Sequence, residues 1–249
     1  MVPLTLVLSP KAWRRRLALE FTSISPHYFV QQDSHRYDGL SRREGLEAEL
    51  TRNLETRREI CEKIVRPHLN SDSAVIDFGC GPGFLAAEIG KHCRTVVGVD
   101  VSRGVVACAR ILSARQPNAE FRVVQDGRLD WAPPGSVDLV CTFAVLQHVP
   151  DLAMERILAE FLRVLKPGGL AICHIAAGSA SSVGNSGGLG RFALLMITRT
   201  VESILEAARR VGFEADAVPV RDVGEIDDDI GRDYLFRLRK PPAPGTVGA

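Results

Sequence analysis

The sequence predicts an α/β protein in which helices cover both faces of a mostly parallel sheet. Three observations support this class. Between residues 71 and 177, short runs rich in Val and Ile alternate with helical patterns. The first run ends in glycines at alternate positions, where a strand can turn sharply into a helix. The 249 residues, 45% of them hydrophobic, suffice for one large domain or two small ones, with a core that needs no disulfide or structural metal.

The elements of the alternating region follow one another regularly. Each strand candidate is short and bounded by turn residues, and these candidates are residues 74–78, 95–99, 121–124, 137–143 and 170–174. Helical patterns separate them at residues 84–92, 103–114 and 152–165. Ser102 and Asp151 stand where helix N-caps are expected.

The first 70 residues are rich in Arg and Glu and are expected to form an N-terminal helical cap or lid. Apolar residues recur near helical spacing over residues 46–65, and Pro67 stops that helix. We expect the main domain to span residues 71–240 and the Pro- and Gly-rich residues 241–249 to form a disordered tail.

The end of the main domain begins with a Gly- and Ser-rich stretch at residues 178–191. It reads GSASSVGNSGGLGR and is expected to be a flexible loop, because these residues cannot pack. A helix at residues 200–211 follows, with Gly212 as its stop. Two more strand candidates lie at residues 215–220 and 234–238.

Composition excludes several classes of protein. The 31 basic and 30 acidic residues give a net charge of +1, which disfavours a nucleic-acid partner. No apolar run reaches the roughly 18–20 residues that cross a bilayer, so neither membrane insertion nor a signal peptide is expected. None of the six cysteines forms a CxxC pair, and we expect buried thiols in a reducing cytoplasm. A homodimer stays open.

The densest chemical signal is VIDFGCGPGF at residues 75–84. Gly79, Gly81 and Gly83 let a ligand lie against the backbone where the next helix begins. The alternative is a plain tight turn. A dinucleotide fingerprint needs G-x-G-x-x-G, whereas the spacing here is G-x-G-x-G. Asp77 would repel a pyrophosphate but attract an ammonium group, so the turn favours a zwitterionic ligand that contains a nucleoside.

Two acidic residues follow at the ends of the next strands. Asp100 would accept hydrogen bonds from two ribose hydroxyls, or else be a charge near a helix N-terminus. Asp126, with Gly127, would accept from the exocyclic amine of an adenine, or else form an Asp-Gly turn.

These motifs together resemble the class I S-adenosylmethionine-dependent methyltransferases. VIDFGCGPG, VVGVDVS, QDG, SVDLVCTFAVLQHVPD and RVLKPGG stand in the order and spacing of that family. The resemblance implies a three-layer Rossmann-like fold, whose seven-stranded sheet has an antiparallel last strand, and S-adenosylmethionine as cofactor. By position, Gly79 and Gly81 would line the methionine and ribose end, Val101 would cover the adenine, and Phe143 would face the sulfonium.

The acceptor is expected to be a small-molecule hydroxyl on a sugar, polyketide or other secondary metabolite. An N- or C-acceptor and a non-catalytic cofactor-binding module are the alternatives. A hydroxyl must lose its proton, so His148 is the first candidate base and His174 the second, either of which would otherwise be structural. Tyr28 and Tyr37 are expected in a lid over the acceptor, or else in helix packing. No metal site is expected, because the acidic run at residues 225–229 reads as a solvated loop.

Overall fold

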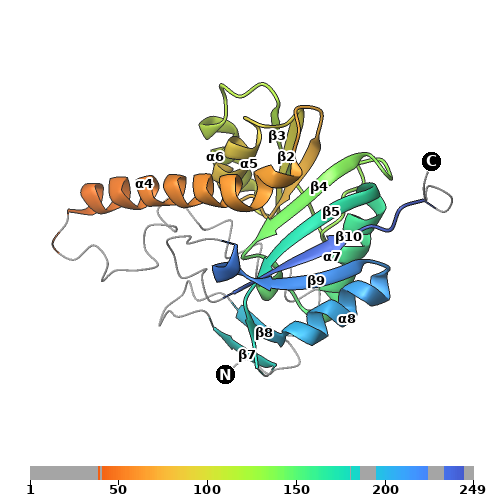
Figure 1. The fold of residues 1–249 in the computed structure, drawn as a ribbon. Coiled ribbons are helices and arrows are strands. Elements are labelled where there is room, and N and C mark those ends of the chain that lie inside the picture. Colours follow the sequence, from red (N-terminus) through yellow and green to blue (C-terminus); the bar gives the residue numbers. More distant parts are fainter. Residues whose placement is uncertain (1–38, 40, 180, 186–194, 224–232, 244–249) are drawn as a thin grey trace.

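We describe a computed structural model of the chain, covering residues 39, 41–179, 181–185, 195–223 and 233–243. Its centre is a seven-stranded sheet in the order β3-β2-β1-β4-β5-β10-β9 (Figure 1). The strands are β1 (Ala74–Phe78), β2 (Thr95–Asp100), β3 (Ala119–Val123), β4 (Val137–Phe143), β5 (Leu165–Ile175), β9 (Glu214–Pro219) and β10 (Tyr234–Arg239). β10 runs antiparallel to both of its neighbours, whereas the pairs among β1 to β5 are parallel. The predicted fold class is therefore confirmed.

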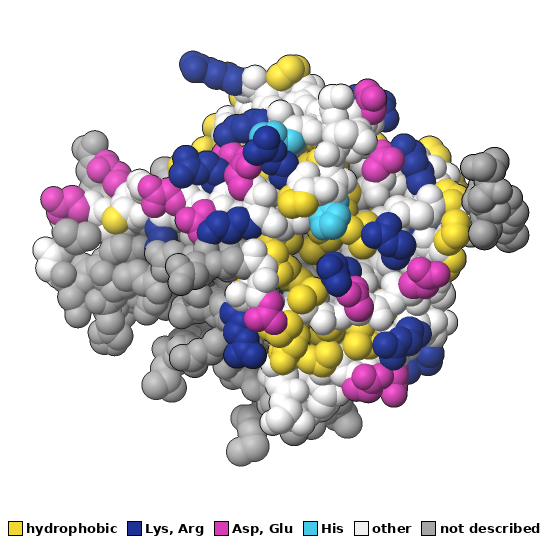
Figure 2. Space-filling view, in the orientation of Figure 1, with side chains coloured by type: hydrophobic (Ala, Val, Ile, Leu, Met, Phe, Trp, Pro, Cys, Tyr) yellow, Lys and Arg dark blue, Asp and Glu magenta, His cyan; other side chains and the backbone are white. Residues whose placement is uncertain are grey.

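Helices cover both faces of this sheet. One face carries α4 (Arg42–Ile60), α5 (Phe84–Ile89) and α6 (Arg103–Leu112), and the other carries α7 (Asp151–Val164) and α8 (Val201–Val211) (Figure 1). On the face shown in Figure 2, basic and acidic side chains alternate without a broad field of one sign. No helix among the described residues is both long and apolar enough to cross a membrane.

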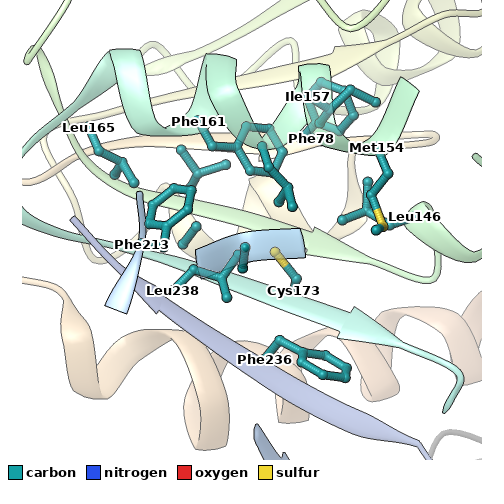
Figure 3. Packing of buried hydrophobic residues seen from close by; sticks show 14 of the residues in the cluster. Phe78, Leu146, Met154, Ile157, Phe161, Leu165, Cys173, Phe213, Phe236 and Leu238 are labelled. Carbon is teal, nitrogen blue, oxygen red and sulfur yellow. The ribbon is translucent and has the colours of Figure 1, made fainter. Parts of the chain in front are cut away.

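The core has two parts, one on each face. On the α7 side, Met154, Ile157 and Phe161 reach the sheet, where the Phe161 ring meets Phe78 edge-on at 5.0 Å between centroids (Figure 3). On the other side, Ile60 and the short π-helix η1 (Cys61–Val65) pack with α5 and the strands. Each fully buried side chain of this size contributes about 1.5–3 kcal/mol.

The helix ends follow the expected signals with one exception. The Ser102 side chain caps α6 by accepting from Val105 N at 3.3 Å, and Gly212 ends α8 with φ 114°. Pro67 lies in the 3₁₀ turn η2 (Arg66–His68), which ends the helical segment begun by α4. The predicted Asp151 cap is wrong. Pro150 is the N-cap of α7, because Asp151 is already helical and its carboxylate bonds elsewhere.

The Gly- and Ser-rich stretch is not simply a loop. A three-stranded sheet, in the order β6-β8-β7, joins β6 (Ala177–Gly178), β7 (Ser182–Asn185) and β8 (Leu195–Thr200). The prediction that residues 178–191 cannot pack is therefore wrong for residues 182–185, whose backbone pairs with β8. Backbone hydrogen bonds hold such a strand irrespective of its small side chains. The remaining short elements are the 3₁₀ turns η3 (Leu146–His148) and η4 (Val220–Asp222).

Candidate active site

The turn after β1, residues 79–83, is named here the glycine turn. The backbone N–H groups of Gly79 and Cys80 both donate to Val99 O, at 2.8 and 2.9 Å, which folds the turn against the end of β2. Gly79, Gly81 and Gly83 have φ values of 76°, 54° and 84°. A Cβ on Gly79 would stand 2.2 Å from Val145 Cγ2. The sharp turn expected from the sequence is thus present, and only glycine fits at position 79, whereas the expected contact with a ligand stays a prediction.

Asp100 ends β2 beside the glycine turn. Its Oδ2 accepts from Gly81 N at 3.1 Å and its Oδ1 from Ser102 N at 2.9 Å. Burial raises the pKa of Asp100, and these backbone bonds oppose that rise. Each carboxylate oxygen has further acceptor capacity, so the side chain can receive two hydroxyl groups without losing its position.

Asp77 lies beneath the same turn and is only 2% exposed. Its Oδ1 is 3.8 Å from the Cys141 thiol, whereas its Oδ2 has no hydrogen-bond partner in the part of the chain that the structure describes. Burial raises the pKa of Asp77 to about 7, the charge of Asp100 adds to the rise, and the Arg57 guanidinium opposes it. A buried carboxyl with a free oxygen is suited to bind a cationic group.

The sequence analysis did not identify Arg57. It lies on α4, 20 positions before Asp77, in a helix that alternates charged residues throughout. Nothing in the local sequence distinguishes it from the other arginines of that helix. Only the packing of α4 along the sheet brings its charge close to Asp77.

The turn after β3 contains the next predicted pair. Asp126 is exposed with φ 61°, and Gly127 follows with φ 72°. A Cβ on Gly127 would stand 2.4 Å from Ile157 Cγ1, so this position also requires glycine. Val101 is half-buried directly after β2, the neighbouring strand. The predicted adenine contacts therefore lie at adjacent strand ends, which is consistent with their assigned roles without testing them.

Residues 143–148 follow β4 and are named here the strand-four exit. Phe143 is half-buried, and Ala144 is exposed with φ 57°, a conformation that costs a non-glycine residue about 1–3 kcal/mol. Ala144 N donates to His174 O at 3.3 Å, which ties the exit to β5. His148 is half-buried at the end of η3. The two candidate bases thus belong to adjacent strand ends.

A buried arginine also fixes the strand-four exit. Arg199 of β8 is 4% exposed and donates to Leu146 O at 3.1 Å, to Val149 O, and to Asp151 Oδ1 at 2.7 Å. Sequence reasoning missed it, because it follows the Gly- and Ser-rich stretch and no motif surrounds it. The small sheet is therefore attached to the exit through a guanidinium.

Two predicted features lie outside the described residues. The first is the lid with Tyr28 and Tyr37, so its acceptor contacts stay predictions. The second is the acidic run at residues 225–229. In the described part of the chain, no three His, Cys, Asp or Glu side chains are grouped closely enough to hold a metal ion.

Comparison with known proteins agrees with this geometry. Residues 75–169 match a family described as a methyltransferase domain. The chain is 38% identical over 119 residues to trans-aconitate 2-methyltransferase of Azoarcus sp. (strain BH72), a match that covers 47% of this chain and 44% of that one. It is 35% identical over 97 residues to ubiquinone biosynthesis O-methyltransferase of Paracidovorax citrulli, covering 38% and 40%. The matches thus span less than half the length of these two relatives.

A solved structure extends the likeness of the fold. Phosphoethanolamine N-methyltransferase 1 of Haemonchus contortus, in complex with phosphoethanolamine and S-adenosylhomocysteine, superposes with a TM-score of 0.66. The comparison covers 100% of this chain and 53% of that one, at 14% identity. At this identity the likeness concerns the fold.

Proposed function

We propose that the chain is a class I S-adenosylmethionine-dependent methyltransferase, because residues 75–169 match a methyltransferase-domain family, and that it transfers a methyl group to a small-molecule hydroxyl. The observation that carries this proposal is the cluster at the ends of β1 and β2, where Asp77, the glycine turn and Asp100 converge. When bound, S-adenosylmethionine supplies a methyl group activated by its sulfonium.

The residues at the glycine turn fit the parts of this cofactor. Asp77 has a buried oxygen without a partner, which an ammonium group satisfies. Arg57 carries the charge that a carboxylate needs, and Asp100 has the acceptor capacity for two ribose hydroxyls. Asp126 and Val101 receive the adenine by amine contact and packing. Glycine at position 79 keeps the turn in this shape, because a Cβ there would meet Val145.

The strand-four exit is the proposed acceptor side. Holding an acceptor in line with the methyl group accounts for much of the acceleration in such displacements. A hydroxyl must also release its proton, and His148 and His174 are the bases that the exit and β5 offer. The name of one relative specifies an O-methyltransferase. N-methylation of a small molecule is the second candidate.

We also propose where and with what the protein acts. All six cysteines are free, which fits the reducing conditions of the cytoplasm. The near-zero net charge makes a small molecule a better partner than a nucleic acid. The proposed chemistry does not require a homodimer. It also does not depend on whether the N-terminal cap ends at residue 70.

Formation of S-adenosylhomocysteine tests the proposal. The purified chain is incubated with S-adenosylmethionine and a catechol, trans-aconitate or phosphoethanolamine, and products are identified by mass spectrometry. We expect turnover with an oxygen acceptor. Calorimetric binding of S-adenosylhomocysteine without turnover of any acceptor would instead indicate a cofactor-binding interaction module. Turnover of the amine alone would favour N-methylation.

A further inference from the structure

His174 occupies an unusual position at the carboxyl end of β5. It is 2% exposed and lies opposite Phe143 of β4 and Leu235 of β10 in the strand register. Its ring stacks on Phe143, with centroids 5.8 Å apart and planes inclined by 10°. The imidazole is thus held flat against an aromatic residue of the strand-four exit.

Neither ring nitrogen of His174 makes a hydrogen bond. Nε2 lies 3.2 Å from Asp233 Oδ2, an ion-pair distance, but the two groups are not aligned for a hydrogen bond. Nδ1 has no partner at all among the described residues. An unsatisfied buried polar group costs about 1–3 kcal/mol. A ligand hydroxyl at Nδ1 would remove that cost.

Asp233 is fixed by the backbone beside it. It directly precedes β10, and its carbonyl oxygen accepts from Val220 N of η4 at 2.9 Å. Its side chain is about one-fifth exposed, so its carboxylate keeps some contact with water. An ionised carboxylate beside an imidazole stabilises the protonated ring.

Other charged groups near His174 belong to different pairs. Arg237 of β10 pairs with Asp216, and Arg221 of η4 pairs with Asp222. Asp77 and Cys141 face the same side of the sheet as His174, on β1 and β4, and they contact each other. Asp233 is therefore the charge that faces the imidazole most closely in the described part of the chain.

His148 has a different setting. It ends the η3 turn, whose neighbouring carbonyls at Leu146 and Val149 are bound by Arg199. Its own backbone N–H donates to Val145 O at 2.9 Å. It also makes at least one further interaction, whereas Nδ1 of His174 has no hydrogen-bond partner among the described residues. These hydrogen bonds fix the conformation of the segment that carries His148.

We propose that His174 is the catalytic base for the acceptor hydroxyl and that Asp233 is its positioning residue, an inference that rests on the proposed function. The hydroxyl proton passes to Nδ1 of His174, and the oxygen forms a bond to the methyl carbon. The carbon–sulfur bond of the sulfonium breaks, and its electron pair stays on sulfur. Asp233, whose Oδ2 lies 3.2 Å from Nε2, balances the charge of the imidazolium, which later releases its proton to water.

The test combines turnover with a spectroscopic readout. Variants His174→Asn, His148→Asn, Asp233→Asn and Asp233→Glu are assayed with the catechol acceptor across pH. The matched control is Glu62→Gln, because Glu62 Oε1 stands 3.2 Å from His92 Nε2 in a more exposed pair. Nuclear magnetic resonance of ¹⁵N-histidine protein, with and without S-adenosylhomocysteine and the catechol, reports the tautomer of His174.

We expect His174→Asn to lower turnover about 10²–10⁴-fold and His148→Asn less than about tenfold, with unchanged affinity for S-adenosylhomocysteine. Asp233→Asn should lower turnover about tenfold, and Asp233→Glu should restore part of it. The tautomer signal of His174 should change in Asp233→Asn and on acceptor binding, and not in Glu62→Gln.

The outcomes separate the inference from the proposed function. A large loss confined to His148→Asn, or a His174 signal that ignores Asp233→Asn, overturns the assignment while leaving methyl transfer intact. A wild-type protein that binds S-adenosylhomocysteine yet methylates no acceptor overturns the proposed function, and the base with it. If His174→Asn does not fold, the Asp233 variants test the inference instead. The Asp233 side chain is partly exposed, so its substitution should leave the fold intact.

Discussion

The glycine turn and the strand-four exit lie at neighbouring strand ends, yet they are built differently. At the glycine turn, short-range backbone bonds from Gly79, Cys80 and Gly81 to the end of β2 hold the shape. At the exit, Arg199 and His174 from β8 and β5 hold it. The glycine turn is thus formed by its own motif and the end of the next strand, and any chain with this motif can form it. The strand-four exit depends on contacts between residues about 50 positions apart, so it can vary with the acceptor.

Removing Arg199 should break the exit while sparing the glycine turn. Arg199→Ala leaves the buried carbonyls of Leu146 and Val149 without donors, and we expect the free energy of unfolding to fall by about 4 kcal/mol. Denaturant unfolding measures this loss. Arg209→Ala is the control, because Arg209 forms an exposed pair with Glu202 and should change stability by less than about 0.5 kcal/mol. Equal losses of unfolding free energy in Arg199→Ala and Arg209→Ala would show that Arg199 does not hold the strand-four exit in place.

Gly79 tests how closely the two sites pack on each other. Gly79→Ala forces a side chain at φ 76° and against Val145 of the exit, and should cost about 3 kcal/mol of folding stability. Gly135→Ala is matched, since its φ is 66° but nothing lies within 4 Å of the new Cβ. It should cost only about 1 kcal/mol, the backbone contribution. Equal losses of stability in Gly79→Ala and Gly135→Ala, measured by denaturant unfolding, would mean that the Val145 side chain moves away from the new Cβ at no cost.

The different construction of the two sites explains what the sequence could predict. Asp77, Gly79 and Asp100 stand in short segments after or within predicted strands, so the sequence could assign each a cofactor role, which stays a prediction. The seven-stranded, mostly parallel sheet with its antiparallel last strand followed from the strand–helix alternation and from the family resemblance. β7 was missed, since its pairing with β8 depends on backbone bonds that small side chains do not signal.

The acceptor side was predicted only in part. His148 and His174 were identified as candidates by residue type, but the sequence could not rank them. The difference between the two histidines depends on partners far away in the sequence. Asp233 lies 59 positions after His174, and Arg199 lies 51 positions after His148. Asp151 was misread as a cap for the same reason, because Arg199 engages its carboxylate. Tertiary partners decide these roles.

Asp100 tests the glycine turn alone. Asp100→Ala removes an acceptor of two proposed ribose bonds, so the affinity for S-adenosylhomocysteine should fall at least about tenfold, or about 1.4 kcal/mol. Calorimetry measures it, with a folded far-ultraviolet spectrum as a check. Asp130→Ala, which removes an exposed carboxylate paired with Arg128, should leave the affinity unchanged. Unchanged affinity in Asp100→Ala would remove this residue from the site.

Asp77 makes both folding stability and ligand binding depend on pH. Its pKa of about 7 in the folded chain lies above the ordinary value of 3.8, mainly because it is buried. The protonated form is therefore favoured by folding, and the stability of the free chain should decline as pH rises from about 4 to about 7.

Ligand binding should depend on pH in the opposite sense. An ammonium group beside Asp77 favours the ionised carboxylate, so binding releases a proton from Asp77 and affinity for S-adenosylhomocysteine should rise between pH 5.5 and 7. The rise is limited to about 15-fold, because Asp77 is ionised in half of the free chain near pH 7 and in roughly 3% of it at pH 5.5. Calorimetry in buffers of different ionisation enthalpy measures both the affinity and the released proton. In Asp77→Asn the affinity should be lower and independent of pH over this range. A parent chain whose affinity is also flat would place the ammonium group away from Asp77, and would leave the free oxygen of that buried carboxyl without a ligand.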